Sequence, residues 1–154
     1  MIMKQRIYID TSVVGGYFDE EFEEATKLFF KKVIETKTIL VVSKLLEYEV
    51  SFAPDNVRDF FDSLPKEWIE YIEVTEDAKT LANKYIEEKV VGKSSLADCQ
   101  HIAIATLCRV NVLVSWNFKH IVNLPRIHGY NSINMKEGQQ ILEIRNPKEI
   151  FKND

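Results

Sequence analysis

The sequence predicts an α/β fold: a three-layer α/β/α arrangement, with helices on both faces of a central parallel sheet of four to five strands. Short apolar runs that suit buried strands recur along the chain, and longer segments with apolar residues at helical spacing lie between them. Strands that alternate with helices build parallel sheets, because each crossover helix returns the chain to the same edge. The 154 residues contain no repeat, low-complexity tract or Pro/Gly/Ser-rich linker, so we expect a single domain over 1–154.

The strands are predicted from short apolar or alternating runs. In order, they are expected at residues 6–10, 38–42, 69–74, 112–114 and 141–144. TILVV at 38–42 is expected to be a buried strand, because a continuous apolar run that is mostly β-branched is typical of a strand buried on both faces. ILEI at 141–144 is the optional fifth strand, which leaves the expected number at four to five.

The helices are predicted from apolar residues spaced three and four positions apart. They are expected at residues 22–35, from near Lys44 to 50, between Pro54 and Pro65, at 76–89, at 95–109, and in one more stretch after 114. Proline suits the first turn of a helix but cannot continue one, so Pro54 opens its helix and Pro65 closes it.

Composition and charge limit the classes of function. Hydrophobic residues make up 45% and charged residues 29% of the chain, as in ordinary globular proteins, and the net charge is −4. A nucleic-acid contact therefore needs a local basic patch or a bound cation. The start of the chain lacks the apolar run of a signal segment, and no window holds the ~18 apolar residues of a membrane span, so we expect a cytoplasmic protein with no membrane contact.

The two cysteines fit a reducing compartment. Cys99 and Cys108 are nine positions apart on one expected helix. At about 100° per residue they face opposite sides of it and cannot form a disulfide. We expect two buried free thiols without chemistry.

Three carboxylates are predicted to meet at one edge of the sheet. Sites in open α/β sheets lie beyond the carboxyl ends of the strands. Asp10 ends the first strand, and Glu49 lies in the first turns of the helix after the second. Asp98 begins a helix that runs antiparallel to the strand 112–114, so that its start lies over the carboxyl end of that strand. Topology alone thus brings Asp10, Glu49 and Asp98 together.

Such a cluster points to a divalent cation. Carboxylates packed together stay ionised only if a positive charge compensates them, or else one takes up a proton. Oxygen ligands suit Mg²⁺ or Mn²⁺, and no Cys/His cluster argues for zinc. A bound Mg²⁺ can polarise a phosphodiester, activate water and steady the leaving oxygen.

Each acid also has a structural interpretation. Asp10 precedes Thr11-Ser12 and could form a turn or helix cap. Glu47 rivals Glu49, although the register of the helix favours Glu49. Asp98 completes a capping-box pattern three residues after Ser95.

Two further side chains near these acids have open roles. His101 lies one turn beyond Asp98, where a packed histidine is the alternative to a supporting role in catalysis. Trp116 is expected to fill the core, with base stacking as the alternative.

Four stretches resemble one known family. They are IYIDTSV at 7–13, VSKLLEYEV at 42–50, SLADCQHIAIA at 95–105 and VLVSWNFKHI at 112–121. In order and spacing they resemble the PIN domain, and more closely the VapC-type toxin ribonucleases of type II toxin–antitoxin systems. The resemblance spans nearly the whole chain, and the third and fourth stretches are its most specific part.

The resemblance implies a metal-dependent endoribonuclease of PIN-like fold. Asp10, Glu49 and Asp98 would bind Mg²⁺ or Mn²⁺, and the hydroxyl of Thr11 or Ser12 would assist at the metal. It also implies an RNA substrate, a homodimer, and a cognate antitoxin that inserts a segment into the active-site groove.

One position departs from the family pattern. Many PIN nucleases carry a fourth acid after the fourth strand, where this chain has Asn117, a candidate catalytic residue, with Ser115 as a supporting residue at the same edge. An amide can orient water or a cation but adds no charge, so one metal position is favoured over two.

A basic loop follows Asn117. Lys119, His120 and Arg126, with His128, lie in a stretch that contains no acid. They are candidate phosphate contacts, and a solvated basic loop is the alternative.

Rival classes fit less well. A phospho-acceptor receiver domain needs paired acids after strand one and an Asp after strand three, where this chain has Val74-Thr75. An aspartate phosphatase needs a second Asp where Ser12 stands, and the sequence has no phosphate-binding glycine motif. The remaining alternative is a catalytically silent PIN-like module that binds RNA or a protein partner.

Overall fold

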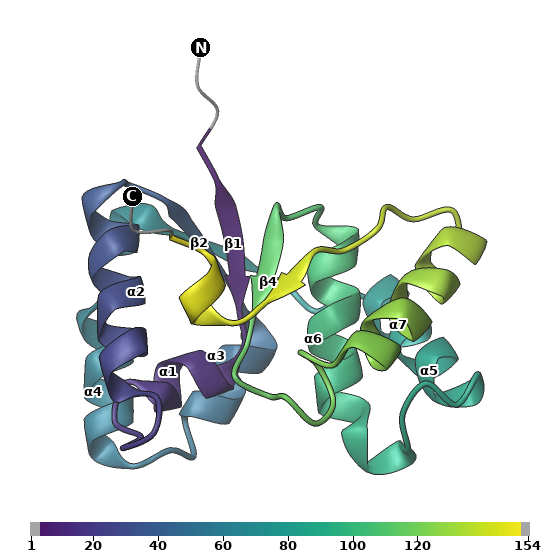
Figure 1. Cartoon of the computed structure of the whole chain (residues 1–154), viewed down its shortest axis with the longest axis horizontal. Coiled ribbons are helices and arrows are strands. Elements are labelled where there is room, and N and C mark those ends of the chain that lie inside the picture. The colour runs from purple at the N-terminus through teal and green to yellow at the C-terminus, as the bar shows by residue number, and fades with distance from the viewer. Residues whose placement is uncertain (1–3, 152–154) are drawn as a thin grey trace.

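Five strands pair in parallel in the computed structural model, which describes residues 4–151 (Figure 1). In sheet order they are β3 (Ile69–Ile72), β2 (Ile39–Ser43), β1 (Arg6–Ile9), β4 (Val112–Val114) and β5 (Ile144–Arg145). The first strand of the chain is therefore the middle strand of the sheet. In the register, Tyr8 of β1 pairs with Val41 on one side and Leu113 on the other.

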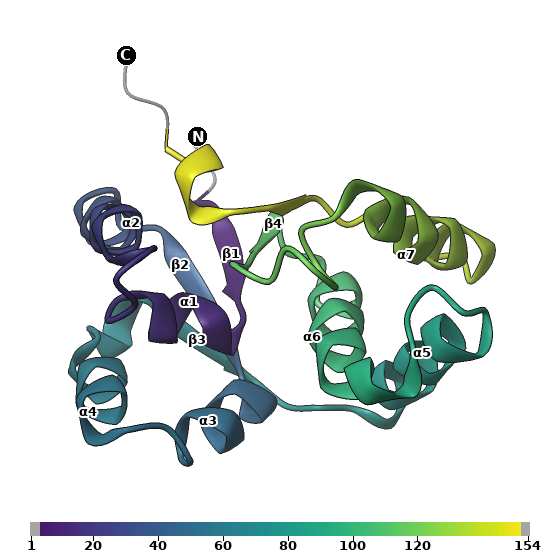
Figure 2. The same ribbon diagram turned by 60° about the horizontal axis from the view of Figure 1, so that its bottom comes forward.

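Seven α-helices surround this sheet within the described residues. They are α1 (Thr11–Gly16), α2 (Glu23–Glu35), α3 (Lys44–Val50), α4 (Asp55–Ser63), α5 (Glu76–Glu87), α6 (Leu96–Leu107) and α7 (Leu124–Lys136). The helices α1 to α4 lie on one side of the strands and α5 to α7 on the other (Figures 1 and 2). The predicted three-layer arrangement is confirmed.

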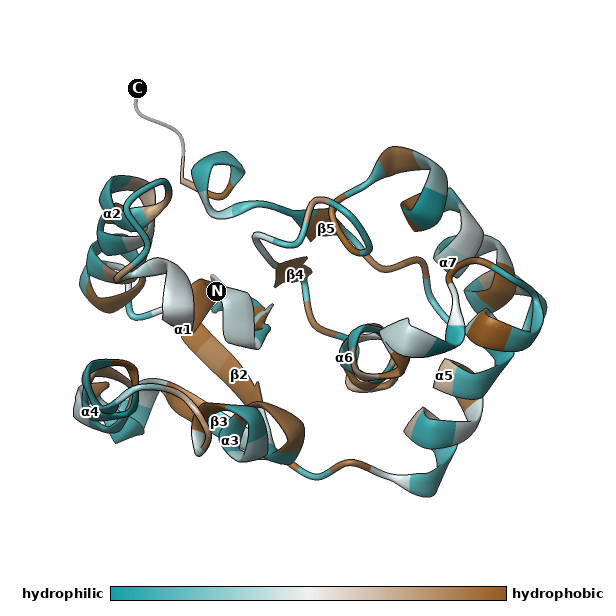
Figure 3. Cartoon of the chain, turned by 90° about the horizontal axis from the view of Figure 1, so that it is seen from below, coloured by the Kyte–Doolittle hydropathy of each residue, from teal (hydrophilic) through white to brown (hydrophobic). Residues whose placement is uncertain are grey.

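Alternate residues of each strand enter different cores, because successive side chains of a strand point to opposite faces. Ile7 and Ile9 pack with α1 to α4, whereas Tyr8 packs with α5 to α7. The same alternation holds in β2, where Leu40 and Val42 face the first core and Val41 faces the second. Strands β2 and β4 are accordingly mostly hydrophobic, while the helices carry both hydrophobic and hydrophilic residues (Figure 3).

Two elements differ from the prediction. Helix α1 was not expected, because its six residues end in Gly15-Gly16, which have low helix propensity. The fifth strand is Ile144–Arg145 and not 141–144. Its expected beginning is diverted because the side chain of Asn131 on α7 hydrogen-bonds both backbone groups of Leu142.

Cys99 and Trp116 lie where the sequence predicts, whereas Cys108 is less buried than expected. Both cysteines are free, with Cys99 buried, but Cys108 is only half-buried, because it caps the exposed end of α6. Trp116 fills the core as expected, stacked on Phe22 at 4.3 Å and donating from Nε1 to Oγ1 of Thr26.

Within residues 4–151, none of the helices has the length and apolar content needed to cross a lipid bilayer.

Candidate active site

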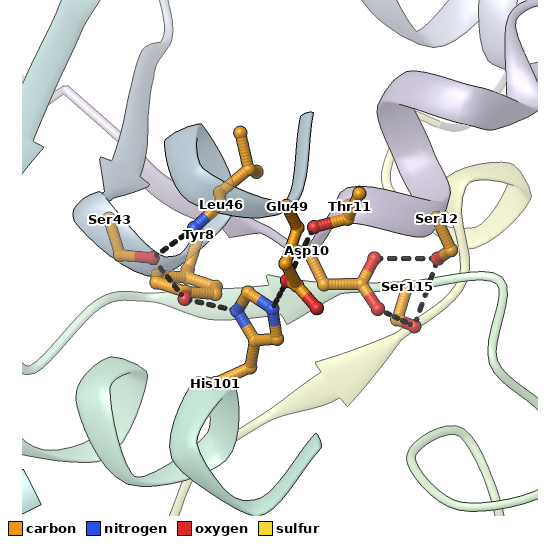
Figure 4. A network of polar contacts seen from close by, with 9 residues as sticks. All are labelled: Tyr8, Asp10, Thr11, Ser12, Ser43, Leu46, Glu49, His101 and Ser115. Atoms are coloured by element: carbon orange, nitrogen blue, oxygen red, sulfur yellow. Dashed lines mark hydrogen bonds and ion pairs between the residues drawn. The ribbon is translucent and has the colours of Figure 1, made fainter. Parts of the chain in front are cut away.

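Asp10 lies directly after β1, at the carboxyl edge of the sheet, and only 4% of its surface is exposed. Its carboxylate does not cap α1. Instead, Oδ1 accepts a hydrogen bond from Ser12 Oγ and Oδ2 accepts one from Ser115 Oγ, both at 2.6 Å (Figure 4). Burial raises the pKa of Asp10, and the charge of Asp98 adds to the rise, while His101 and the two hydroxyls oppose it.

Both hydroxyls that hold Asp10 are themselves oriented by the backbone after β4. The Trp116 N–H donates to Ser12 Oγ, and the Asn117 N–H donates to Ser115 Oγ, each at 2.9 Å. Each hydroxyl thus accepts from an amide and directs its single proton to a carboxylate oxygen of Asp10. The predicted supporting residues Ser12 and Ser115 therefore lie in direct contact with the first acid.

Glu49 projects from α3 toward the same edge. Its Oε1 accepts from Thr11 Oγ1 at 2.7 Å and from His101 Nε2 at 2.6 Å (Figure 4). Although burial raises the pKa of Glu49, the His101 and Thr11 contacts outweigh it and leave the pKa below its usual value. Glu47 instead has its Oε1 3.6 Å from Nζ of Lys44, so the helix register directs Glu49 and not Glu47 into this network.

Asp98 lies in the first turn of α6 and is half-buried. Ser95 makes no side-chain cap at this helix, so the capping-box pattern does not account for the acid. Burial raises the pKa of Asp98 and the charge of Glu49 raises it further, against the opposing influence of His120, His101 and the Asn117 amide. The three predicted acids are therefore close enough to affect one another electrostatically.

The loop after β4 borders this cluster. Asn117 Oδ1 accepts from the backbone N–H of His120, whose Nδ1 is buried and has no hydrogen-bond partner among residues 4–151. Lys119 is exposed. The guanidinium of Arg126 anchors the loop, because it donates hydrogen bonds to the backbone oxygens of Lys119 and Val90. Phosphate contacts by Lys119, His120 and Arg126 stay a prediction.

The donor set fits Mg²⁺ or Mn²⁺ by type and charge, although the side chains do not form a preassembled centre. Asp10, Glu49 and Asp98 offer only oxygen ligands. Neither aspartate is ion-paired with a lysine or arginine in the part of the chain that the structure describes. Over those residues, no three His, Cys, Asp or Glu side chains converge into a ready metal site. The pKa values of Asp10 and Asp98 are raised, and no basic side chain of residues 4–151 is paired with either acid. A bound cation would stabilise the charged forms of these carboxylates.

Sequence reasoning missed two members of the network, Tyr8 and Ser43. Tyr8 lies two positions before Asp10, so both side chains leave β1 on the same face. Its hydroxyl lies 2.9 Å from Ser43 Oγ and 2.5 Å from His101 Nδ1. A tyrosine inside an otherwise apolar buried strand is a usable signal, because a buried phenol needs a hydrogen-bond partner.

Comparisons with known proteins identify the fold. No protein-family model matches the sequence, and no curated protein matches it significantly. Among solved structures, a chain of DNA-bound VapBC from Salmonella typhimurium aligns with a TM-score of 0.57 and 13% identity, covering 94% of this chain and 99% of that one. A chain of VapBC2 from Rickettsia felis, bound to a DNA fragment from its promoter, aligns with a TM-score of 0.53 and 13% identity, covering 92% and 98%.

The third structure is VapC20 from Mycobacterium tuberculosis, described as a Sarcin-Ricin loop cleaving toxin. It aligns with a TM-score of 0.57 and 11% identity, covering 73% of this chain and 91% of that one. The alignments extend over most of each chain. This chain has the PIN-like fold of the VapC toxins.

Proposed function

We propose that this chain is a divalent-metal-dependent endoribonuclease and the toxin of a toxin–antitoxin pair. One observation carries the proposal. Asp10 after β1, Glu49 on α3 and Asp98 in the first turn of α6 lie at the carboxyl edge of the sheet, where Asp98 raises the pKa of Asp10 and Glu49 raises the pKa of Asp98. The fold supports the same conclusion, because VapC20, which shares it, is described as a Sarcin-Ricin loop cleaving toxin.

In this role, Asp10, Glu49 and Asp98 would hold Mg²⁺ or Mn²⁺. A cation bound by these oxygens would supply the positive charge that polarises a phosphodiester and lowers the pKa of water. The protein's part is to keep the acids placed and ionised. Ser12 and Ser115 fix both oxygens of Asp10, so this carboxylate is held rigidly before any ligand arrives.

RNA would approach this edge past the loop that follows β4. The chain is acidic overall, so the phosphates must be attracted locally. Lys119 is exposed beside Asn117, and His120 is near enough to Asp98 to lower its pKa. We assign these two residues to phosphate contact, with Arg126 as the residue that shapes the loop between them and α7.

The proposal extends to partners. Two of the structures with this fold are VapBC assemblies, which supports a cognate antitoxin for this chain. A homodimer and a cytoplasmic location belong to the same proposal.

The test is RNA cleavage with purified protein. Total RNA is incubated with the wild type in Mn²⁺, in Mg²⁺ and in EDTA, beside Asp10→Asn and Asp98→Asn. Asp62→Asn is the matched control, because Asp62 is an exposed aspartate of α4 on the other side of the sheet from α6. We expect metal-dependent cleavage that both site variants lose and the control retains.

Two results would contradict the proposal. Cleavage that is equal in all four proteins would come from a contaminant and would remove the site assignment. A wild type that binds RNA but does not cleave it in either metal would instead establish a catalytically silent PIN-like module. Asn117 in place of a fourth acid would fit that outcome.

A further inference from the structure

A chain of hydrogen bonds runs from the interior of the sheet to Glu49. Tyr8 and Ser43 are fully buried, and His101 is 2% exposed. The Tyr8 hydroxyl lies between Ser43 Oγ and His101 Nδ1, and His101 Nε2 contacts Glu49 Oε1 at 2.6 Å (Figure 4). The links join the neighbouring strands β1 and β2 to the helices α6 and α3.

The donors and acceptors allow a consistent direction for each proton. Glu49 is a carboxylate and only accepts, so Nε2 of His101 carries a proton. The Leu46 N–H donates to Ser43 Oγ, and we assign the Ser43 proton to the Tyr8 oxygen and the Tyr8 proton to Nδ1 of His101. Every donor then has an acceptor when His101 is the neutral Nε2–H tautomer. This tautomer is an assignment from the network of partners. The ¹H–¹⁵N spectrum of His101 tests it against an imidazolium, which would donate from Nδ1 to Tyr8 and would carry the positive charge that lowers the pKa values of Asp10 and Asp98.

The two carboxylate oxygens of Glu49 differ in their hydrogen bonding. Oε1 accepts two hydrogen bonds, from Thr11 and from His101. Oε2 receives none from residues 4–151. The carboxylate is therefore held by one oxygen, and the other keeps its lone pairs for a ligand.

We propose that Tyr8 is a positioning residue for Glu49, acting through His101, which it holds in the tautomer and orientation that fix the Glu49 carboxylate. This inference rests on the proposed function, in which Glu49 is a cation ligand. Orienting partners of this kind determine how well a ligand set is preorganised, and their loss typically costs 10–100-fold in metal affinity or activity.

Packing alone does not require the Tyr8 hydroxyl. A phenylalanine would fill the same space, and a buried hydroxyl is unfavourable unless it is hydrogen-bonded. Tyr85 offers the comparison within the same core: it is equally buried, and its hydroxyl donates to Oδ1 of Asn134 on α7. That bond leads away from the acids, so Tyr85→Phe removes the same group without touching the chain to Glu49.

The experiment compares wild type, Tyr8→Phe and Tyr85→Phe. Mn²⁺ affinity is measured by isothermal titration calorimetry, and RNA cleavage is measured as kcat and KM. We expect Tyr8→Phe to weaken Mn²⁺ binding roughly 10- to 100-fold and to lower kcat with little change in KM. Tyr85→Phe should match the wild type in all three quantities.

A spectroscopic readout needs neither metal nor RNA. Long-range ¹H–¹⁵N spectra distinguish the two tautomers of a histidine, and the signals of His101 are assigned by their loss in His101→Gln. We expect the Nε2–H tautomer in the wild type and in Tyr85→Phe, and a mixture or shifted signals in Tyr8→Phe.

The outcomes separate this inference from the proposed function. Wild-type-like Mn²⁺ affinity and kcat in Tyr8→Phe, or an Nδ1–H tautomer in the wild type, would overturn the positioning role. If the wild type neither binds Mn²⁺ nor cleaves RNA, the proposed function is wrong and the role at a cation falls with it, whatever the His101 spectrum shows.

Discussion

Ser115 donates a hydrogen bond from Oγ to Oδ2 of Asp10 over 2.6 Å, although 105 positions separate the two residues in the sequence. The contact exists because β1 and β4 are parallel neighbours whose carboxyl ends meet at one edge. It holds a buried carboxylate in place at an energetic cost, since burial disfavours the charged form.

Replacing Asp10 should reduce RNA cleavage without lowering the stability of the metal-free fold. Asp10→Asn keeps the shape and can keep both serine contacts, because each hydroxyl has two lone pairs. It removes a buried charge, so the metal-free variant should melt at the same temperature as the wild type or higher. RNA cleavage should fall at least ~100-fold. A scan in EDTA checks the melting temperature, and a clear loss of stability would show that the carboxylate is structural.

The metal-free protein should become more stable as the pH is lowered from neutral, and added metal should remove this gain. The pKa values of Asp10 and Asp98 are raised, so the folded state holds protons at a pH where the unfolded chain has lost them. Lowering the pH from neutral through these pKa values should therefore stabilise the metal-free protein. The lowered pKa of Glu49 acts oppositely, and its contribution disappears only at still lower pH.

Melting temperatures measured from pH 7 downward in EDTA and in Mn²⁺ test this expectation. The gain at lower pH should be present in EDTA, absent in Mn²⁺, and reduced in Asp10→Asn. Identical curves with and without Mn²⁺ would mean that no cation interacts with these acids.

Restoring the fourth acid should make the protein more dependent on metal. Asn117 now lowers the pKa of Asp98, and a carboxylate in its place would repel Asp98. Asn117→Asp should destabilise the metal-free fold by about 1 kcal/mol and increase the rise in melting temperature that Mn²⁺ produces. Calorimetric stoichiometry shows whether a second cation binds. An unchanged response to Mn²⁺ would place residue 117 outside the metal's reach.

Two adjacent glycines of α1 should respond oppositely to alanine. A Cβ on Gly16 would lie 2.7 Å from Trp116 Nε1 and 2.8 Å from Thr26 Oγ1, so Gly16→Ala should cost about 1–3 kcal/mol of unfolding free energy. A Cβ on Gly15 meets nothing within 4 Å, so Gly15→Ala should stabilise α1 by roughly 0.5–1 kcal/mol. Urea denaturation measures both, and equal effects would contradict the close approach of Trp116 to α1.

The sequence predicted the layers of this fold because strand and helix periodicities are strong in it. It also predicted which edge collects the acids, since parallel topology decides that without any side-chain detail. The helix α1 was missed because its two glycines have low helix propensity, whereas Val13 and Val14 hold it in the core that α1 to α4 share.

Contacts within the site lay beyond the sequence. Ser115 donates a hydrogen bond to Asp10, and Thr11 donates one to Glu49. These pairings depend on side-chain rotamers and on distances of under 3 Å between distant segments. The same holds for Tyr8, whose partner His101 is 93 positions away. Composition gives no sign of which buried hydroxyl will meet which histidine.

The central position of β1 has a consequence for synthesis on the ribosome. This strand is made first and can pair with β2 once about 40 residues have emerged, but its other neighbour, β4, follows roughly 105 positions after it. Until then, one edge of β1 stays unpaired and open to wrong partners. Closing so long a loop is slow, because its entropy must be lost before the contacts form. A nascent chain that stalls before Ser115 would thus carry Asp10 without one of its two holding groups, so catalysis would be withheld until translation has passed β4.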